Sequence, residues 1–174
     1  PALFTASYFG LNGPVLTIST ACSSGNKALF SASRLISAGI CDAVICGGVD
    51  TICPLTLNGF DSLDLLSERP CNPFSKNRDG TMIGEGAAVF LLSKKTRENS
   101  QSIDLLGAGE RSDAYHISAP DPGAHGAIET IREALEKASL QPEDIGYINL
   151  HGTGTVLNDA MESYCVNKLF GAAL

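Results

Sequence analysis

The chain has 174 residues, of which 44% are hydrophobic, so it can bury a sizeable core. Its formal net charge is −7, and acidic residues are spread along it, which argues against a nucleic-acid-binding surface. No apolar stretch approaches the roughly 20 residues needed to cross a membrane, and there is no signal-peptide pattern, so we expect a cytoplasmic location.

The first predicted elements surround a cysteine. Residues 15–20 form an apolar, β-branched run typical of a buried strand, and residues 24–38 carry apolar groups at helical spacing up to Gly39. Cys22 stands at this junction, where free N–H groups and the positive end of the helix dipole would stabilise a thiolate. This position favours a reactive thiol, and the alternative is a buried structural cysteine.

Further strands follow this helix. Residues 42–48 read as a short buried strand, so residues 15–48 predict a βαβ unit with parallel pairing and a right-handed crossover. Residues 53–82 contain three prolines and predict an irregular excursion over the sheet. Residues 86–92 predict another strand, and the charged stretch 94–102 a linker.

The remaining chain predicts a second unit of β-α-β type. Its helix has one apolar and one charged side, so it would pack on a sheet with one face in water. The two histidines of its loop, His116 and His125, are predicted to be surface residues. The strand, loop, helix and strand of this unit are predicted at residues 103–107, 112–126, 126–138 and 145–150.

The last predicted strand runs directly into His151, which is followed by Gly152-Thr153-Gly154-Thr155. The carboxyl end of a strand is where ligands bind in α/β sheets. The glycines let the backbone approach a substrate closely, and the threonine hydroxyls can donate or accept hydrogen bonds. Together with Cys22, this loop favours a catalytic histidine over a structural one.

Four segments resemble motifs of the β-ketoacyl synthases, the condensing enzymes of fatty-acid and polyketide assembly. They occur in the family's order over nearly the whole chain, although Thr81 stands where many members have Phe. The segments are Thr20-Ala21-Cys22-Ser23-Ser24-Gly25, Asn72-Pro73-Phe74 through Arg78-Asp79-Gly80 to Gly84-Glu85-Gly86-Ala87, His151-Gly152-Thr153-Gly154-Thr155, and Asn158-Asp159-Ala160-Met161-Glu162.

The resemblance implies a thiolase-like α/β fold, in which two similar halves stack face to face. It also implies a parent well over twice this length, so we expect an internal fragment that spans the end of the first half and the start of the second. Residues 1–100 would be the C-terminal part of the N-terminal half, and residues 101–174 the N-terminal part of the C-terminal half. A homodimer that pairs through the strand before Cys22 is a further implication.

The implied reaction is a decarboxylative condensation. Cys22 would take an acyl group from a carrier thioester, and His151 would stabilise the enolate formed when a malonyl thioester loses CO₂. Thr153 and Thr155 match positions that contact the pantetheine arm. A thiolase-like acyltransferase and a non-catalytic chain-length-factor subunit are the alternatives, and the cysteine argues against the second.

The Asn158–Glu162 segment has two interpretations. Glu162, together with Asn158, matches residues that support the site in the family. Alternatively, Asn158 and Asp159 cap a helix, with Glu162 as the capping-box partner. Asp79 and Glu85 are expected to be structural, pairing with Arg78 or with buried amides.

The partner implied by the resemblance is an acyl carrier protein, whose phosphopantetheine carries the acyl and malonyl thioesters. The chain itself is expected to use no cofactor, and the spacing of its six cysteines and three histidines completes no metal site. The second catalytic histidine and the lysine of the family are expected beyond Leu174. This piece alone should therefore be inactive.

Overall fold

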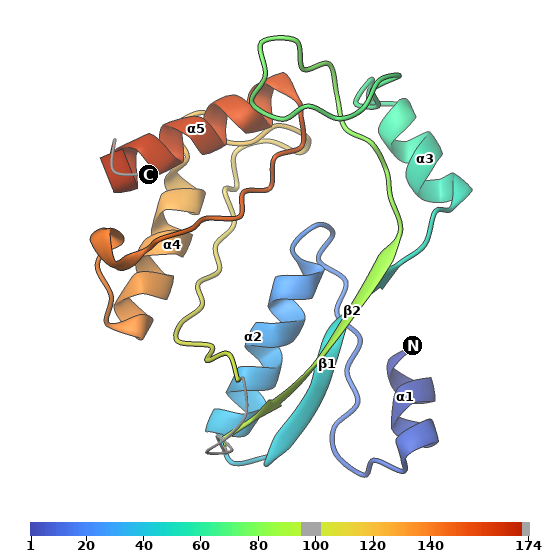
Figure 1. The fold of residues 1–174 in the computed structure, drawn as a ribbon. Helices are drawn as coiled ribbons and strands as arrows, with labels where there is room; N and C mark the ends of the chain where they lie inside the picture. The colour runs from blue at the N-terminus through green and yellow to red at the C-terminus, as the bar shows by residue number, and fades with distance from the viewer. Residues whose placement is uncertain (95–101, 172–174) are drawn as a thin grey trace. The chain divides into compact units, whose positions relative to one another are not determined.

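A computed structural model describes residues 1–94 and 102–171 of the chain, which fall into two compact units (Figure 1). Unit 1 comprises Pro1–Thr51 and Glu85–Ile103, and unit 2 comprises Ile52–Gly84 and Asp104–Leu174. The excursion predicted for residues 53–82 therefore belongs to the unit that holds His151. The domain boundary predicted between residues 100 and 101 lies outside the described residues.

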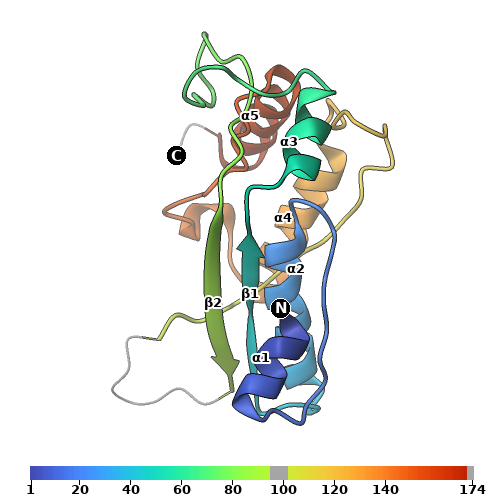
Figure 2. The same cartoon turned by 90° about the vertical axis from the view of Figure 1, so that its right-hand side faces the viewer.

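Unit 1 is a two-stranded antiparallel sheet with a helix packed against it (Figure 2). Ala43 lies opposite Ser93 at one end of the strand pair. A side chain at Gly47 would collide with the carbonyl oxygen of Ala88, so glycine allows the strands to approach closely at this point. The elements are α1 (Ala2–Phe9), α2 (Ser24–Ser37), β1 (Ala43–Asp50) and β2 (Gly86–Ser93).

The helix α2 and both strands confirm the elements predicted for residues 24–38, 42–48 and 86–92, but β1 is half-buried at its centre and exposed at its ends, not buried as predicted. The strand predicted for residues 15–20 is wrong, and so is the parallel βαβ unit, because residues 15–19 form no strand and β1 pairs instead with β2, in antiparallel order. A strand needs a neighbour that satisfies its N–H and C=O groups. Within the described residues this run has no such neighbour beyond an isolated bridge at Thr20.

Unit 2 is built on the contact between two helices. Ala124, Ile128 and Cys165 form its buried cluster, to which α5 contributes Cys165 and α4 contributes Ile128. None of the described residues forms a helix with the length and apolar character needed to cross a bilayer. The elements are α3 (Pro54–Asp61), α4 (His125–Ala138), a 3₁₀ turn at Pro142–Asp144 and α5 (Val156–Phe170).

The helix α4 confirms the prediction for residues 126–138. The strands predicted at 103–107 and 145–150 are wrong, since the described residues there form no ladder. A side chain at Gly107 or Gly109 would collide with α4 carbonyl oxygens, so this segment does pack on the helix as a strand would. The pattern thus identified an extended segment that meets the helix at Gly107 and Gly109, but Ile103, Leu105 and Leu106 are exposed, and the segment has no hydrogen-bonding strand beside it among the described residues. The prediction also missed α3, which begins at Pro54 within the expected irregular stretch.

Candidate functional site

Cys22 lies in unit 1 on a tight turn that leads into α2. Ala21, immediately before it, has a φ of 50°, in the left-handed region that residues with a Cβ rarely adopt. The Ser24 hydroxyl fixes the turn by accepting from the Thr20 N–H at 2.8 Å and donating to the Ala21 carbonyl at 2.6 Å. Ser23 adds a third bond, from its hydroxyl to the Thr20 carbonyl at 2.7 Å. Such a strained turn is typical of nucleophiles that project from the start of a helix.

The Cys22 side chain is exposed and its thiol is free. The N–H groups of Ser23 and Ser24 donate to the carbonyls of Thr20 and Ala21, at 3.3 and 3.0 Å. These two N–H groups are therefore occupied by the turn, contrary to the expectation that they would face the sulfur.

Other cysteines differ from Cys22 in their surroundings. Burial raises the pKa of the Cys46 and Cys165 thiols, which keeps both in the unreactive neutral form. Cys53 caps the start of α3, where hydrogen bonding to the Thr56 hydroxyl and N–H lowers its pKa. Cys53 is therefore the natural control for any test of Cys22.

The His151 loop, residues 151–155, lies in unit 2 directly before α5. Gly152 and Gly154 have φ values of 54° and 73°, which only glycine adopts readily. A side chain at Gly154 would come within 2.9 Å of the Cys71 Sγ and 2.5 Å of the Gly80 oxygen. The loop is therefore packed against the 71–80 segment, which carries the second family-like motif.

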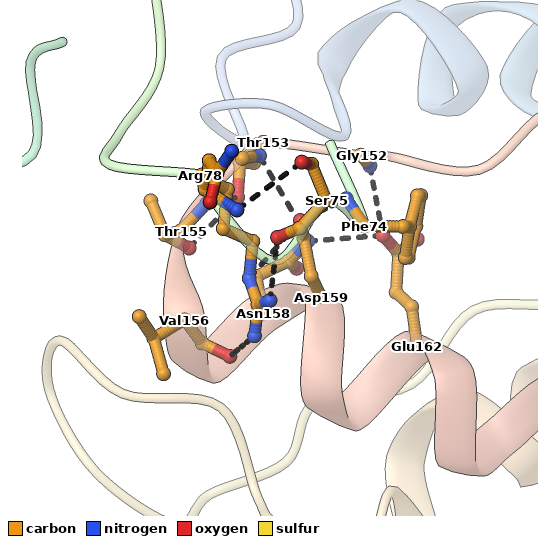
Figure 3. Close-up of polar contacts among 12 residues, drawn as sticks. Phe74, Ser75, Arg78, Gly152, Thr153, Thr155, Val156, Asn158, Asp159 and Glu162 are labelled. Atoms are coloured by element: carbon orange, nitrogen blue, oxygen red, sulfur yellow. Dashed lines mark hydrogen bonds and ion pairs between the residues drawn. The ribbon is translucent and has the colours of Figure 1, made fainter. Parts of the chain in front are cut away.

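Glu162 holds the backbone of this loop (Figure 3). Its Oε1 accepts from the His151 N–H at 2.7 Å, and its Oε2 accepts from the Gly152 N–H at 2.8 Å. The Asn158 amide donates to the same Oε2 at 2.9 Å and so orients the carboxylate. Hydrogen bonds to a carboxylate are about twice as strong as those between neutral groups, so this contact fixes the backbone position from which the His151 side chain extends.

The helix-cap interpretation of this segment is wrong. The helix α5 begins at Val156 with Thr155 as its N-cap, so Asn158 and Asp159 lie inside the first turns. The carboxylate of Glu162 bonds to the loop and not to an N-cap N–H. The geometry favours the alternative, in which Glu162 and Asn158 support the loop.

Asp159, which the sequence suggested only as a helix cap, connects the His151 loop to the 71–80 segment. It carries a carboxyl group, yet it is only 1% exposed. Its Oδ1 accepts from the Gly154 N–H at 3.2 Å, and its Oδ2 accepts from the Phe74 N–H at 2.7 Å. Phe74 has a φ of 60°, so Asp159 ties together two left-handed residues that are 80 positions apart (154 − 74). The sequence showed this acidic residue four positions after Thr155, but not its contacts with Gly154 and Phe74.

The threonines of the loop form a hydroxyl pair. Thr153 Oγ1 and Thr155 Oγ1 lie 2.8 Å apart, and the Thr155 N–H donates to Thr153 Oγ1 at 3.4 Å. Both side chains are half-buried. The pair can offer one further hydroxyl hydrogen to a polar chain that passes the loop.

Asp79 was expected to be structural and to pair with Arg78 or with buried amides, and the first of these two pairings is wrong. Asp79 instead accepts from the Ser67 hydroxyl at 2.6 Å and from the Arg69 guanidinium at 2.6 and 3.0 Å, while Arg78 faces Asp159. The Ser67 hydroxyl, followed by Arg69, holds the pKa of Asp79 below its ordinary value.

This lowered pKa predicts a pH dependence. The ionised Asp79 contributes stability above its unfolded pKa of about 3.9, and that contribution is lost as the pH falls through the folded pKa. Ser67→Ala should raise the pKa of Asp79, as followed by NMR titration of its carboxyl carbon. Ser62→Ala, which removes a hydroxyl bonded to the Gly59 carbonyl, is the control. An unchanged Asp79 midpoint in Ser67→Ala would contradict the assignment.

The structure thus brings together five of the six predicted site residues, His151, Thr153, Thr155, Asn158 and Glu162, within unit 2. Cys22 belongs to unit 1. His116 and His125 are exposed, as predicted. Over residues 1–94 and 102–171, no group of three or more metal-ligating side chains is arranged to hold an ion.

Two family models match the chain. The model for "Beta-ketoacyl synthase, N-terminal domain" matches residues 2–98, and that for "Beta-ketoacyl synthase, C-terminal domain" matches residues 104–174. Among curated relatives, Nodulation protein E of Rhizobium leguminosarum bv. trifolii is 37% identical over 94% of this chain and 42% of its own length. The 3-oxoacyl-[acyl-carrier-protein] synthase 2 of Synechocystis sp. is 37% identical over 96% of this chain and 43% of its own length.

Solved structures give the same result. A ketosynthase in complex with its chain length factor, from Xenorhabdus doucetiae, is 51% identical with a TM-score of 0.94, over 98% of this chain and 42% of that one. A type II polyketide ketosynthase in complex with its acyl-carrier protein is 30% identical with a TM-score of 0.89, over 99% of this chain and 45% of that one. The chain therefore spans about two fifths of the length of the proteins it matches.

Proposed function

Because the chain belongs to the β-ketoacyl synthase family, with the thiolase-like α/β fold of solved ketosynthases, we propose that the whole protein is a β-ketoacyl-[acyl-carrier-protein] synthase. It would condense a Cys22-bound acyl group with a malonyl carrier thioester in fatty-acid or polyketide synthesis. The observation that carries this proposal is the fixed backbone of the His151 loop. Glu162 accepts the N–H groups of His151 and Gly152, and Asp159 accepts those of Gly154 and of Phe74 in the neighbouring segment.

In the first half-reaction, the sulfur of Cys22 attacks the carbonyl carbon of an acyl thioester. The carbon–sulfur bond to the carrier breaks, and the proton of the Cys22 thiol ends on the released carrier thiol. Thioester exchange is nearly balanced in energy, so the acyl group can later leave the protein again. The exposed sulfur on the strained turn supports this role.

In the second half-reaction, a malonyl thioester loses CO₂, and the electron pair of the broken bond moves into an enolate. The Nε2–H of His151 donates to the enolate oxygen, a contact of a kind that contributes roughly 2.7–4 kcal/mol. The enolate carbon then attacks the acyl carbonyl, a carbon–carbon bond forms, and the Cys22 thiolate leaves. Thr153 and Thr155 would bind the pantetheine arm, and Glu162 with Asn158 would hold His151 in place.

The partner proposed is an acyl carrier protein, whose phosphopantetheine brings both thioesters, so no cofactor is assigned to this chain. A solved relative in complex with its acyl-carrier protein supports this assignment. A homodimer remains the proposed assembly. A second candidate is a heterodimer with a chain length factor, because the 51% identical ketosynthase forms a complex with its own.

Release of CO₂ from malonyl-carrier thioester by the whole protein tests the reaction type. We expect release that depends on a prior acyl group on the protein, with a β-ketoacyl carrier as product, both measured by mass spectrometry. Acetyl exchange without CO₂ would instead indicate a thiolase. Neither CO₂ nor product, with the carrier still bound, would indicate a non-catalytic subunit.

A further inference from the structure

Arg78 joins the 71–80 segment to the start of α5. Its Nη1 donates to the Ser75 carbonyl at 3.0 Å, and its Nη2 donates to the Val156 carbonyl at 3.4 Å (Figure 3). Its Nε lies 3.6 Å from Asp159 Oδ2. One guanidinium therefore contacts both the 71–80 segment and α5, the helix that follows the His151 loop.

The Arg78–Asp159 pair is largely withdrawn from water. The side chain of Arg78 is 21% exposed and that of Asp159 is 1% exposed. The Nε atom is buried and makes no hydrogen bond among the described residues, and the carboxylate of Asp159 lies 3.6 Å from it. A buried carboxylate that loses its counter-charge is costly to keep in place.

Asp159 connects Arg78 to the backbone of the His151 loop. Its two oxygens accept the N–H groups of Gly154 and Phe74, both of which are in left-handed conformations. Phe74 in turn packs on the loop, since its ring lies 3.5 Å from where a Cβ on Gly152 would stand. A shift of the Asp159 carboxylate would therefore displace both the Gly154 N–H and the Phe74 ring that packs on Gly152, the residue after His151.

We propose that Arg78 is a positioning residue for the His151 loop, acting through Asp159 and Val156. The catalytic consequence rests on the proposed function, whereas the effect on the loop does not. Removing the guanidinium leaves Asp159 buried without its partner and frees the 152–156 backbone to shift. A displacement of about 1 Å at a reacting group can cost about 10²-fold in rate.

The test compares Arg78→Gln and Arg78→Lys with wild type in the whole protein. Arg69→Gln is the matched control, because Arg69 is an arginine of the same unit whose exposed partner is Asp79. Hydrogen exchange followed by mass spectrometry reports the amides of peptides covering 72–80 and 151–156. CO₂ release from malonyl thioester and acylation of Cys22 are measured separately on the same samples.

In Arg78→Gln we expect faster exchange in both peptides, about 10²-fold slower CO₂ release, and Cys22 acylation within twofold of wild type. Arg78→Lys should lie between, because an ammonium restores the charge but not all three contacts. Arg69→Gln should match wild type in the 151–156 peptide and in CO₂ release. Unchanged exchange in Arg78→Gln would overturn the proposal, as would equal losses in acylation and CO₂ release with faster exchange throughout. If wild type itself releases no CO₂, the proposed function fails while the exchange data still decide the role of Arg78.

Discussion

Cys22→Ala is expected to abolish covalent acylation of the whole protein. When wild type is incubated with an acyl-carrier thioester, its mass should rise by one acyl group, carried on the peptide that contains Cys22. The alanine variant keeps the turn, because the bonds that fix it come from the Ser23 and Ser24 side chains and the backbone. It has no sulfur to attack the thioester, so both the adduct and the condensation product should disappear.

Cys53→Ala is the matched control for this experiment. Among the cysteines whose pKa is shifted, Cys53 alone is shifted downward, by its bonding with Thr56, so it is the thiol that would most readily compete in labelling. We expect this variant to acylate as wild type does. An adduct that persists in Cys22→Ala and disappears in Cys53→Ala would move the nucleophile to unit 2.

His151→Ala is expected to slow decarboxylation of malonyl thioester by about 10²–10³-fold, the loss found when one oxyanion donor is removed. Acylation of Cys22 should persist, since that step uses the sulfur and not the imidazole. The two half-reactions are separated by measuring CO₂ release and the mass of the acyl-protein in parallel. The substitution leaves the Glu162 bonds to the loop intact, because their donors are backbone N–H groups that alanine also has.

His125→Ala provides the control for His151. His125 is exposed and pairs with Asp121 at the start of α4, so its loss removes an imidazole from the same unit. Wild-type rates are expected for this variant. Decarboxylation that survives in His151→Ala would assign the enolate contact to another donor.

Local sequence patterns were sufficient to predict the elements whose backbone hydrogen bonds lie within their own segment. The helices α2 and α4 followed from apolar spacing, and a helix makes its hydrogen bonds within its own segment. The segment 15–20 has the pattern of a buried strand but depends on a neighbour that the pattern does not contain. The start of α3 was marked by Pro54 at its first position, a helix signal that was instead interpreted as a break.

The site could be predicted in its residues but not in its connections. The motifs identified His151 and Glu162, and the structure supplies the bonds from the N–H groups of His151 and Gly152 to the Glu162 carboxylate in α5. The contacts of Asp159 with Phe74 and of Arg78 with Val156 join positions 85 and 78 residues apart, which no periodicity encodes. Both contacts depend on packing that is set by Gly152 and Gly154.

The central claim is that Cys22 and His151 act on one bound substrate. An experimental structure of the whole protein with a non-hydrolysable malonyl thioester analogue tests it most directly. We expect the His151 Nε2 to lie about 2.9 Å from the thioester carbonyl oxygen. The Cys22 sulfur should open into the same cavity, where an acyl group on it would meet the analogue's methylene carbon at about 3–3.5 Å. A sulfur sealed from the cavity that holds His151, or an analogue bound away from both side chains, would contradict the account.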